Sequence, residues 1–444
     1  MMKNLTRRKF VRNTVIGAAG AGLLSSPFRL SALSPNESVN IAIIGLGGRA
    51  YALAQSISLC DNLNLSHVSE VDGNRATRFL EHCDREFGFK PNLNPDFRTI
   101  LDDQDVDAIA IATPEHWHAP MAIMGLQAGK HVYVEKPCSH NPHETELLVQ
   151  AAAQAGTLCQ MGNQQRSSIT SNEAIDLIRG GEIGDVYYGK AWYSNKRGPI
   201  GFGKKVEVPE YLNWDLWQGP APREGYRDNV HPYNWHWFRT WGTGEIHNNG
   251  THEIDICRWA MNVQYPERVV STGGRLHYED DWQWFDTQVA NFEFEGGRTI
   301  IWEGTSCNNI PQFGRGRGSI VYGTEGSAIL DRQGYVFMNL DGKETKKAIE
   351  PDPGTSASTS DTSGFDGLTI RHLRNFTNAI RLGDKLNAPI ADGAVSTQLC
   401  HLGNIAQDLS ANLNVDSGTG KVINNPDATA RWKRSYEPGW EPKL

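Results

Sequence analysis

From residue 38 onward, the chain alternates between short apolar runs and longer amphipathic segments. The run 39–44 (VNIAII) is rich in β-branched residues, as expected of a parallel strand that is buried on both faces. Similar runs lie at 65–71, 107–112 and 131–134, and helical patterns lie at 51–59 and 119–128. This alternation of strands and helices predicts an α/β domain with a parallel sheet over residues 38–165.

The pattern changes after a predicted linking helix at 172–179. Segments that read as strands, separated by glycine-rich turns, lie at 186–193, 269–276, 287–294, 299–304 and 319–322. A solvated loop at 352–364 and helices at 368–382 and 394–413 follow. We expect a second domain over 166–415 and an extended tail over 416–444, which agrees with the two or three domains that 444 residues suggest.

A long insertion at 199–241 interrupts the predicted strands of the second domain. It holds five of the 13 tryptophans of the chain: Trp214, Trp217, Trp235, Trp237 and Trp241. Long loops in compact domains usually have a function, and tryptophans often line carbohydrate sites. We favour a sugar-stacking wall or an oligomer contact, with plain packing of the scaffold as the alternative.

The first predicted strand ends in a glycine-rich turn, Gly45-Leu46-Gly47-Gly48-Arg49-Ala50, and a helix follows. Gly45 permits the tight turn, Gly47 lets the backbone approach a pyrophosphate, and Ala50 allows the helix to pack closely on the strand. The N-terminus of the helix then offers free N–H groups to the phosphates. The turn therefore predicts a dinucleotide site at Gly45, Gly47, Gly48, Arg49 and Ala50, and a purely structural glycine turn is the alternative.

Asp72 follows the second predicted strand. An acidic side chain at this place accepts hydrogen bonds from the ribose hydroxyls of adenosine and repels a 2′-phosphate. We therefore expect NAD as the cofactor. Arg75 lies close enough in the sequence to leave NADP open.

Composition and charge narrow the class of protein. Hydrophobic residues make up 39% and charged residues 21%, which excludes a mainly disordered chain. A net charge of −8 does not fit a general nucleic-acid binder, which needs a basic face. The seven cysteines are scattered without a CxxC pair, which argues against a disulfide framework and a thiolate zinc site.

The first 33 residues resemble an export signal. Basic residues precede a ten-residue apolar run at 15–24, which is too short to cross the roughly 30 Å of a bilayer as a helix. The consecutive Arg7 and Arg8 resemble the twin-arginine signal. We expect a signal segment over 1–33, a periplasmic protein and no stable membrane insertion after signal removal. An ordinary secretory leader or a retained anchor is the alternative.

Several motifs occur in an order that points to one family. The segment 112–137 (ATPEHWHAPMAIMGLQAGKHVYVEKP) follows the glycine turn, and GTGEIHNNGTHEID lies further on at 242–255. The ordered set closely resembles the Gfo/Idh/MocA oxidoreductase family over nearly the whole chain after residue 38. The resemblance implies an N-terminal Rossmann NAD-binding domain and a C-terminal α/β domain with an open, mainly antiparallel sheet. That sheet often forms the subunit interface in the family, so a homodimer or tetramer is expected.

The resemblance also implies which residues carry the reaction. Lys136 of the EKP signature supplies a positive charge at the end of a parallel strand, and Glu135 fixes the backbone there. His252 is the expected proton acceptor, and Asn248 stands where the family has an aspartate, four residues earlier on the same helix face. Asn248 carries no charge and cannot raise the pKa of His252. Asp255 on the same helix is therefore an alternative proton acceptor, and a role at the helix surface or in an ion pair is the other interpretation of this residue.

Other polar residues complete the expected site. Cofactor contacts are expected at Thr113, Pro114, His116, His118, Glu135 and Lys136. Substrate contacts are expected at Asn163, Gln164, Arg166, Trp235, Trp237, His247 and Asp255, with a structural hinge as the alternative for 163–166. The sequence has no H-E-x-x-H pattern and hydride transfer needs no metal, so no metal site is expected.

These expectations lead to an NAD(P)-dependent oxidoreductase that acts on a small-molecule carbohydrate. Hydride would pass between a secondary hydroxyl of a sugar or glycoside, possibly at C3, and a tightly bound cofactor that is regenerated in place, because the periplasm offers no pool of free nicotinamide cofactor. One alternative is a redox-neutral NAD-dependent glycosidase, in which transient oxidation at C3 allows elimination of the aglycone. A non-catalytic dinucleotide-binding sensor is the other.

Overall fold

The computed structural model describes residues 38–352 and 366–444. The expected signal segment at 1–33 and nearly all of the expected loop at 352–364 lie outside the described residues. Among the helices that the structure does describe, none has the length and apolar character needed to cross a membrane.

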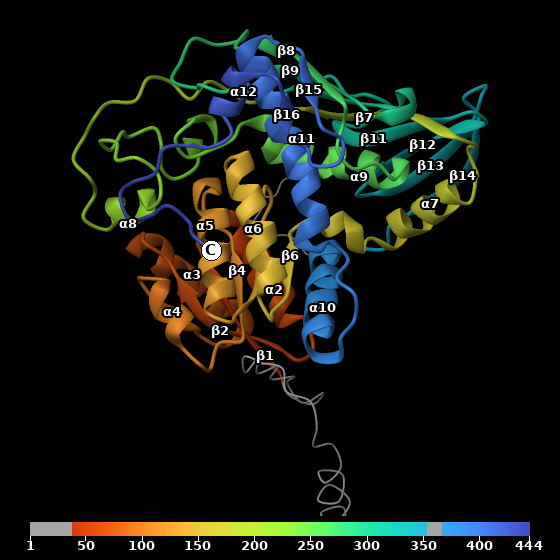
Figure 1. Ribbon diagram of the computed structural model, residues 1–444. Coiled ribbons are helices and arrows are strands. Elements are labelled where there is room, and N and C mark those ends of the chain that lie inside the picture. Colours follow the sequence, from red (N-terminus) through yellow and green to blue (C-terminus); the bar gives the residue numbers. More distant parts are fainter. Residues whose placement is uncertain (1–37, 353–365) are drawn as a thin grey trace, which may run out of the picture. The chain divides into compact units, whose positions relative to one another are not determined.

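The first part of the chain forms a six-stranded parallel sheet with the strand order β3-β2-β1-β4-β5-β6 (Figure 1). Its elements are β1 (Val39–Ile44), α2 (Gly48–Ser58), β2 (Leu63–Ser69), α3 (Gly73–Phe87), β3 (Asn92–Asn94), α4 (Arg98–Asp102), β4 (Ala108–Ile111), α5 (His118–Gln127), β5 (His131–Val134), α6 (Pro142–Gln154) and β6 (Cys159–Met161). The apolar central strands β1, β4 and β5 are almost fully buried because helices cover both faces of the sheet. The strand order is that of a Rossmann fold, and it confirms the predicted parallel domain.

The second part of the chain builds a ten-stranded sheet in the order β14-β13-β12-β11-β7-β10-β9-β8-β15-β16. Its strands are β7 (Val186–Ser194), β8 (Arg268–Gly274), β9 (Thr287–Glu293), β10 (Thr299–Thr305), β11 (Arg317–Gly323), β12 (Gly326–Asp331), β13 (Gly334–Asn339), β14 (Glu344–Ile349), β15 (Leu413–Val415) and β16 (Val422–Ile423). Only the described pair β7 and β10 is parallel, which confirms a mainly antiparallel sheet. Five strands of this sheet, β12 to β16, were not predicted from the sequence.

Three long helices hold the second sheet and join it to the first domain. Helices α7 (Ile169–Arg179) and α9 (Thr251–Met261) pack on β7, β11, β12 and β13, around the buried side chains of Trp302, Phe292 and Phe337. Helix α11 (Ile390–Leu409) packs on β8 and also on α6 of the first domain. The core of the second domain therefore continues to the Rossmann domain through α11.

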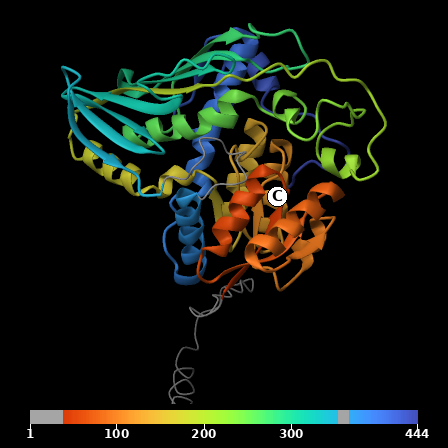
Figure 2. The same ribbon diagram turned by 180° about the vertical axis from the view of Figure 1, so that it is seen from behind.

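Helix α10 (Gly367–Leu382) lies against the Rossmann domain, beside α2, in both views (Figure 1 and Figure 2). Its Ile370, Leu373 and Phe376 are buried in the same hydrophobic cluster as Leu53 and Ile57 of α2. The chain thus returns to the first domain late in the sequence. The expected boundary at 165/166 lies between the two sheets in the sequence. Helix α10 follows that boundary in the sequence but packs on the first domain.

The insertion at 199–241 contains a buried cluster of tryptophans. Its regular elements are α8 (Trp214–Gln218) and the 3₁₀ turn η3 (Asn234–Trp237). Trp214 stacks on Trp217 with ring centroids 4.5 Å apart, and both rings contact Trp241 edge on. These three tryptophans are buried together, so plain packing accounts for them and the expected sugar-stacking wall does not.

The remaining short elements lie at the edges of the larger ones. They are η1 (Glu115–Trp117), η2 (Gln164–Ser167), η4 (Ile246–Gly250), η5 (Glu295–Gly297) and α12 (Pro426–Ala430). The expected extended tail contains β16 and α12. Trp440 near its end contacts Trp117 with ring centroids 5.2 Å apart, so the tail packs back on the Rossmann domain.

Candidate active site

The glycine turn between β1 and α2 has the backbone that a dinucleotide site needs. Gly45 has φ +87°, and a Cβ atom there would lie 2.8 Å from the Thr113 nitrogen, so no other residue fits without a shift. A Cβ on Gly47 would meet only the Arg75 guanidinium, at 3.5 Å. Gly47 therefore leaves its outer side open, in front of the first N–H groups of α2.

Three hollows meet at this turn, and Gly47 and Arg75 line all of them. The one that we call the cleft has a volume of about 130 Å³ and lies between the turn, the ends of β4 and β5, the insertion and η4. A second hollow of about 50 Å³ lies among the loops after β1, β2 and β4, and it includes Glu70 and Trp217. The third, of about 710 Å³, lies outside, between α2 and α3.

The acidic residue at the end of β2 is Glu70, which the sequence analysis missed. Its carboxylate accepts hydrogen bonds from the amides of Leu46, Val71 and Asp72, at 2.7, 2.8 and 2.9 Å, and it lines the second hollow. Asp72 instead caps α3, accepting from the amides of Asn74 and Arg75, and its other oxygen lies 2.8 Å from Nε2 of His231. Asp72 is 3% exposed, and Glu70 rather than Asp72 lines the second hollow at the glycine turn.

Lys136 lies at the end of β5 and reaches into the cleft. Its Nζ donates to the main-chain carbonyl of Asn248 at 2.6 Å and to Oδ1 of the same residue at 3.3 Å. Burial lowers the pKa of Lys136, and the nearby carboxylates of Glu115 and Glu135 oppose that shift. The peptide bond between Lys136 and Pro137 is cis.

Glu135 fixes the backbone next to Lys136. Its Oε1 accepts from Nε of Arg49 at 2.6 Å and from Nε2 of Gln164 at 3.1 Å. Gly162 makes room for this carboxylate, because a Cβ atom there would lie 2.8 Å from Oε2. Arg49 also lines the cleft, so the salt bridge connects the glycine turn to the strand that carries Lys136.

The helix expected to carry both Asn248 and His252 has an irregular start. Asn248 lies in η4, a π-helical turn, and His252 lies in α9, which begins at Thr251. Asn248 lines the cleft, but His252 does not. Burial and the charges of Lys136 and Arg317 hold the pKa of His252 well below its usual range, and its Nε2 has no hydrogen-bond partner in the described part of the chain. The expected pair therefore does not face the cleft together.

Glu115 and His236 line the cleft but were not predicted from the sequence, and the same is true of Ala112, Pro232 and Tyr233. Oε2 of Glu115 accepts from the amide and the hydroxyl of Thr243, at 2.6 and 2.5 Å, and burial raises its pKa to about 7. His236 is carried by the insertion. Nδ1 of its ring lies 2.7 Å from the carbonyl of Tyr233, and the ring stacks on Trp235 with centroids 3.6 Å apart. A carbonyl oxygen can only accept, so Nδ1 of His236 is the protonated nitrogen.

Several expected cofactor residues do reach the cleft. Gly47, Gly48, Arg49, Thr113, Pro114, His118, Glu135 and Lys136 line it, and Trp235 is the expected substrate residue that does so beside them. The ring nitrogens of His118 lie 2.6 Å from the carbonyl of Pro137 and 2.9 Å from that of Thr113, so His118 connects the loops after β4 and β5. Gly45 lines the second hollow, and Ala50 is buried.

Other expected residues lie away from the cleft. His116 is fully buried with Nε2 3.0 Å from the carbonyl of Trp217, and His247 contacts the carbonyl of Thr243 and the ring of His401. Gln164 donates to Tyr133 and Glu135, and Asn163 is buried beside it. These contacts give His116, His247 and Gln164 structural roles, whereas neither polar atom of the Asn163 side chain has a hydrogen-bond partner among the described residues.

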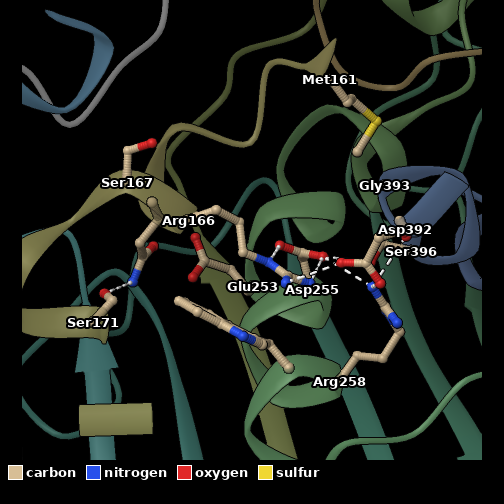
Figure 3. A network of polar contacts seen from close by, with 12 residues as sticks. Met161, Arg166, Ser167, Ser171, Glu253, Asp255, Arg258, Asp392, Gly393 and Ser396 are labelled. Atoms are coloured by element: carbon tan, nitrogen blue, oxygen red, sulfur yellow. Dashed lines mark hydrogen bonds and ion pairs between the residues drawn. The ribbon is translucent and has the colours of Figure 1, made fainter. Parts of the chain in front are cut away.

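Arg166 and Asp255 form a buried ion pair rather than part of the cleft (Figure 3). Two guanidinium nitrogens of Arg166 donate to the carboxylate at 2.7 and 2.8 Å, and Asp392 and Arg258 extend the network. Burial by itself would raise the pKa of Asp255, but Arg166 holds it below the usual range. Asp255 is therefore a poor proton acceptor, and the ion-pairing alternative describes it.

Trp237 is also turned away from the cleft. It is 2% exposed and stacks on Trp282 with ring centroids 4.0 Å apart, whereas its neighbour Trp235 lines the cleft. Within residues 38–352 and 366–444, no group of three His, Cys, Asp or Glu side chains has the arrangement of a metal site.

The fold and the cleft define a two-domain dinucleotide-binding oxidoreductase, and comparisons with known proteins agree. The model of the oxidoreductase family with an NAD-binding Rossmann fold matches residues 39–163, and that of the GFO/IDH/MocA C-terminal domain matches residues 172–329. The chain belongs to the Gfo/Idh/MocA oxidoreductase family, and NAD is its cofactor class.

Solved structures with the same fold include several enzymes that act on polyols and sugars. Levoglucosan dehydrogenase, in complex with NADH and levoglucosan, superposes with a TM-score of 0.64 and 20% identity, over 85% of this chain and 99% of that one. Aldose-aldose oxidoreductase from Caulobacter crescentus, complexed with glycerol, gives 0.62 and 18%, over 85% of this chain and 100% of that one. At these identities the likeness establishes the fold alone.

Among curated relatives, the α-N-acetylgalactosaminidase of Shewanella oneidensis is 26% identical over 215 residues. A glycosyl hydrolase family 109 protein from another Shewanella strain gives the same identity over the same length. In both cases the match covers 43% of this chain and 46% of the relative, so this chain matches less than half the length of these relatives.

Proposed function

We propose that this protein is an NAD-dependent oxidoreductase that transfers hydride between a secondary hydroxyl group of a sugar or glycoside and a tightly bound cofactor. The observation that carries the proposal is the position of Lys136. Its buried ammonium group lies in the same cleft as the glycine turn, at the carboxyl end of a parallel strand where ligands bind in this fold class. Dehydrogenases of polyols and sugars with the same fold support a carbohydrate substrate.

The residues of the cleft suit this chemistry. The open side of Gly47 and the start of α2 suit the pyrophosphate, and NAD supplies the hydride acceptor when it is bound. Lys136, held by Asn248, stabilises the negative charge that develops on the substrate oxygen. Trp235 lines the cleft and supplies aromatic surface that suits the apolar side of a sugar ring. Hydride transfer needs a dry site, and the insertion covers the cleft with Tyr233, Trp235 and His236.

The experiment is a search for the substrate by absorbance. The purified protein, first loaded with NAD, is mixed with a panel of free hexoses and methyl glycosides, and the absorbance near 340 nm is followed. Growth of the NADH band without loss of the aglycone supports the proposal. A protein that binds NAD but shows no change with any member of the panel contradicts it and favours a sensor.

A redox-neutral glycosidase is the second candidate, because curated relatives carry glycosidase names. In that reaction the hydride would return to the sugar within one turnover. Incubation with p-nitrophenyl N-acetyl-α-galactosaminide and related glycosides distinguishes the two candidates. Release of p-nitrophenol without net NADH formation favours the glycosidase, whereas NADH formation with the glycoside intact favours the dehydrogenase.

We also propose that the protein is exported to the periplasm by the twin-arginine route and works as a homodimer or tetramer. The consecutive Arg7 and Arg8 before an apolar run support export. Replacing both with lysine should leave the protein in the cytoplasm, as fractionation would show. Light scattering measures the number of subunits in the oligomer.

The choice between NAD and NADP involves Arg75, which lines the same hollow as Glu70. Its positive charge makes NADP an alternative cofactor, and titration of the protein with both cofactors decides between them.

A further inference from the structure

Glu115 is a buried carboxyl group in the cleft, and only one of its two oxygens accepts hydrogen bonds from described residues. The side chain is 2% exposed, and Oε2 accepts both hydrogen bonds from Thr243. No described residue donates to Oε1, and Glu115 lines the cleft beside Lys136. A carboxylate held on one side in this way presents its second oxygen in a fixed direction.

Thr243 is itself held firmly, so the direction of Glu115 is fixed by the fold. The Thr243 carbonyl accepts from Nδ2 of Asn404 in α11 at 2.8 Å and from Nδ1 of His247 at 3.1 Å. The amide of Thr243 binds Glu115 from the other side. The segment between the insertion and η4 thus connects a carboxyl group of the Rossmann domain to the core of the second domain.

We propose that Glu115 is the proton acceptor of the reaction, taking the proton of the substrate hydroxyl on Oε1 while Lys136 stabilises the developing alkoxide. The inference rests on the oxidoreductase function proposed above. In the oxidation direction, the hydroxyl O–H bond breaks and its proton goes to Glu115. The carbinol C–H bond breaks and its hydrogen leaves with both electrons to the bound nicotinamide, so the alcohol becomes a ketone and NAD becomes NADH.

The charges around Glu115 agree with this role. Burial raises its pKa to about 7, against the two hydrogen bonds from Thr243 and the positive charge of Lys136, and Glu245 adds to the rise. A proton acceptor works best when its pKa lies near the operating pH. His118 and His236 line the same cleft, and burial lowers the pKa of both, that of His236 to about 3. Glu115 is thus a cleft group with a pKa suited to proton exchange near neutrality, whereas His252 does not line the cleft.

The first experiment needs no substrate. Infrared difference spectra of the full-length protein are recorded between pH 5 and 9, for the wild type and for Glu115→Gln. A protonated buried carboxyl group should give a carbonyl band that disappears with a midpoint near pH 7 in the wild type and is absent in Glu115→Gln. Glu295→Gln, which removes an exposed carboxyl group far along the chain, is the control and should keep the band.

The second experiment measures kcat/KM against pH, with the glycoside that forms NADH fastest. The wild-type rate should rise through pH 7, and Glu115→Gln should lose roughly 10² to 10⁴ in rate together with this rise. Thr243→Val removes one donor to the carboxylate, so it should move both the rise in rate and the infrared midpoint to higher pH, which a merely structural role of Glu115 would not do. NAD binding by each variant, followed by tryptophan fluorescence, reports that the fold is intact.

The outcomes separate the two proposals. A Glu115→Gln variant that forms NADH at nearly the wild-type rate, or a wild type without the infrared band, overturns the role of Glu115 and leaves the proposed function standing. A wild type with the band that forms NADH with no member of the panel contradicts the proposed function instead, and the proton-accepting role falls with it.

Discussion

Nζ of Lys136 lies 2.6 Å from the main-chain carbonyl of Asn248, which joins the end of a Rossmann strand to the π-helical turn of the second domain. The position of the ammonium group therefore depends on both domains. Replacing Lys136 with methionine removes the charge and keeps most of the volume. We expect Lys136→Met to retain NAD and to lose NADH formation by about 10² to 10⁴. Stopped-flow absorbance together with a fluorescence titration of NAD measures both; turnover near the wild-type rate would show that Lys136 has another role.

The pair of Arg166 and Asp255 should matter for stability rather than for chemistry. Both side chains are buried, so Arg166→Met removes the bidentate partner of the Asp255 carboxylate, which keeps only Ser396 and the more distant Arg258. This should reduce the free energy of unfolding by about 3 to 5 kcal/mol. Arg268→Met breaks an exposed pair with Glu293 and should cost less than about 1 kcal/mol. Urea unfolding measures both variants. Asp255→Asn, assayed per folded molecule, should still form NADH; loss of hydride transfer in a folded protein would revive Asp255 as the base.

Trp235 and Trp237 are close in sequence but should behave differently. Trp235 lines the cleft, so Trp235→Ala should raise KM for the sugar with little change in stability. Trp237 is buried against Trp282, so Trp237→Ala should destabilise the protein by about 3 to 5 kcal/mol. Steady-state kinetics and thermal unfolding of the two variants check this contrast. Equal effects on KM would mean that both rings contact the substrate.

Glu115 should reduce stability at neutral and alkaline pH. Its pKa is raised to about 7 in the folded protein, compared with about 4.3 in the unfolded chain. Between about pH 4.3 and about pH 7, the folded protein therefore keeps a proton on Glu115 that the unfolded chain has lost. The free energy of unfolding falls as the pH rises through this range to the folded pKa. Glu115→Gln should be more stable than the wild type by up to about 3 kcal/mol at pH 8, and similar to it below pH 4. Denaturant unfolding at both pH values provides the test.

Buried histidines should make the protein sensitive to acid. Burial lowers the pKa of His116 and His247 to about 3 and that of His372 to about 4, whereas an unfolded histidine titrates near 6.5. The unfolded chain binds more protons between these values, so the free energy of unfolding should fall as the pH drops below 6.5. Urea midpoints at pH 7.5, 6 and 5 measure the loss. For His247→Gln, the free energy of unfolding should fall less on acidification than it does for the wild type. For His277→Gln, which changes an exposed ring, it should fall as much as for the wild type.

Local patterns were sufficient to predict the parallel domain and five of the ten strands of the second sheet. A run such as VNIAII has few alternatives to a buried strand, and the glycine turn after it needs the φ of Gly45. The place of Lys136 followed from the motif at the end of β5. The strands β12 to β16 were missed. Of these, β14 is largely exposed, so its sequence (ETKKAI) lacks a clear apolar face.

The rest of the site depends on contacts between distant residues. Nothing local in the sequence shows that Asp72 caps a helix or that Glu70, two residues earlier, lines a hollow at the glycine turn. The environment of Glu115 depends on Thr243, which is 128 residues away in the sequence. The different surroundings of Trp235 and Trp237 depend on Trp282 and on the Rossmann loops. Residue type and spacing along the sequence do not indicate which distant residues will be in contact.

Helix α10 has a consequence for attempts to divide the molecule. A fragment that stops near residue 165 would lack Ile370, Leu373 and Phe376, and the apolar surface of α2 that they cover would be exposed to water. The nucleotide-binding half should therefore aggregate when it is expressed by itself. A peptide spanning 366–388, supplied separately, should restore the solubility of this half. A version of the half that carries this helix fused before residue 38 should be soluble without the peptide.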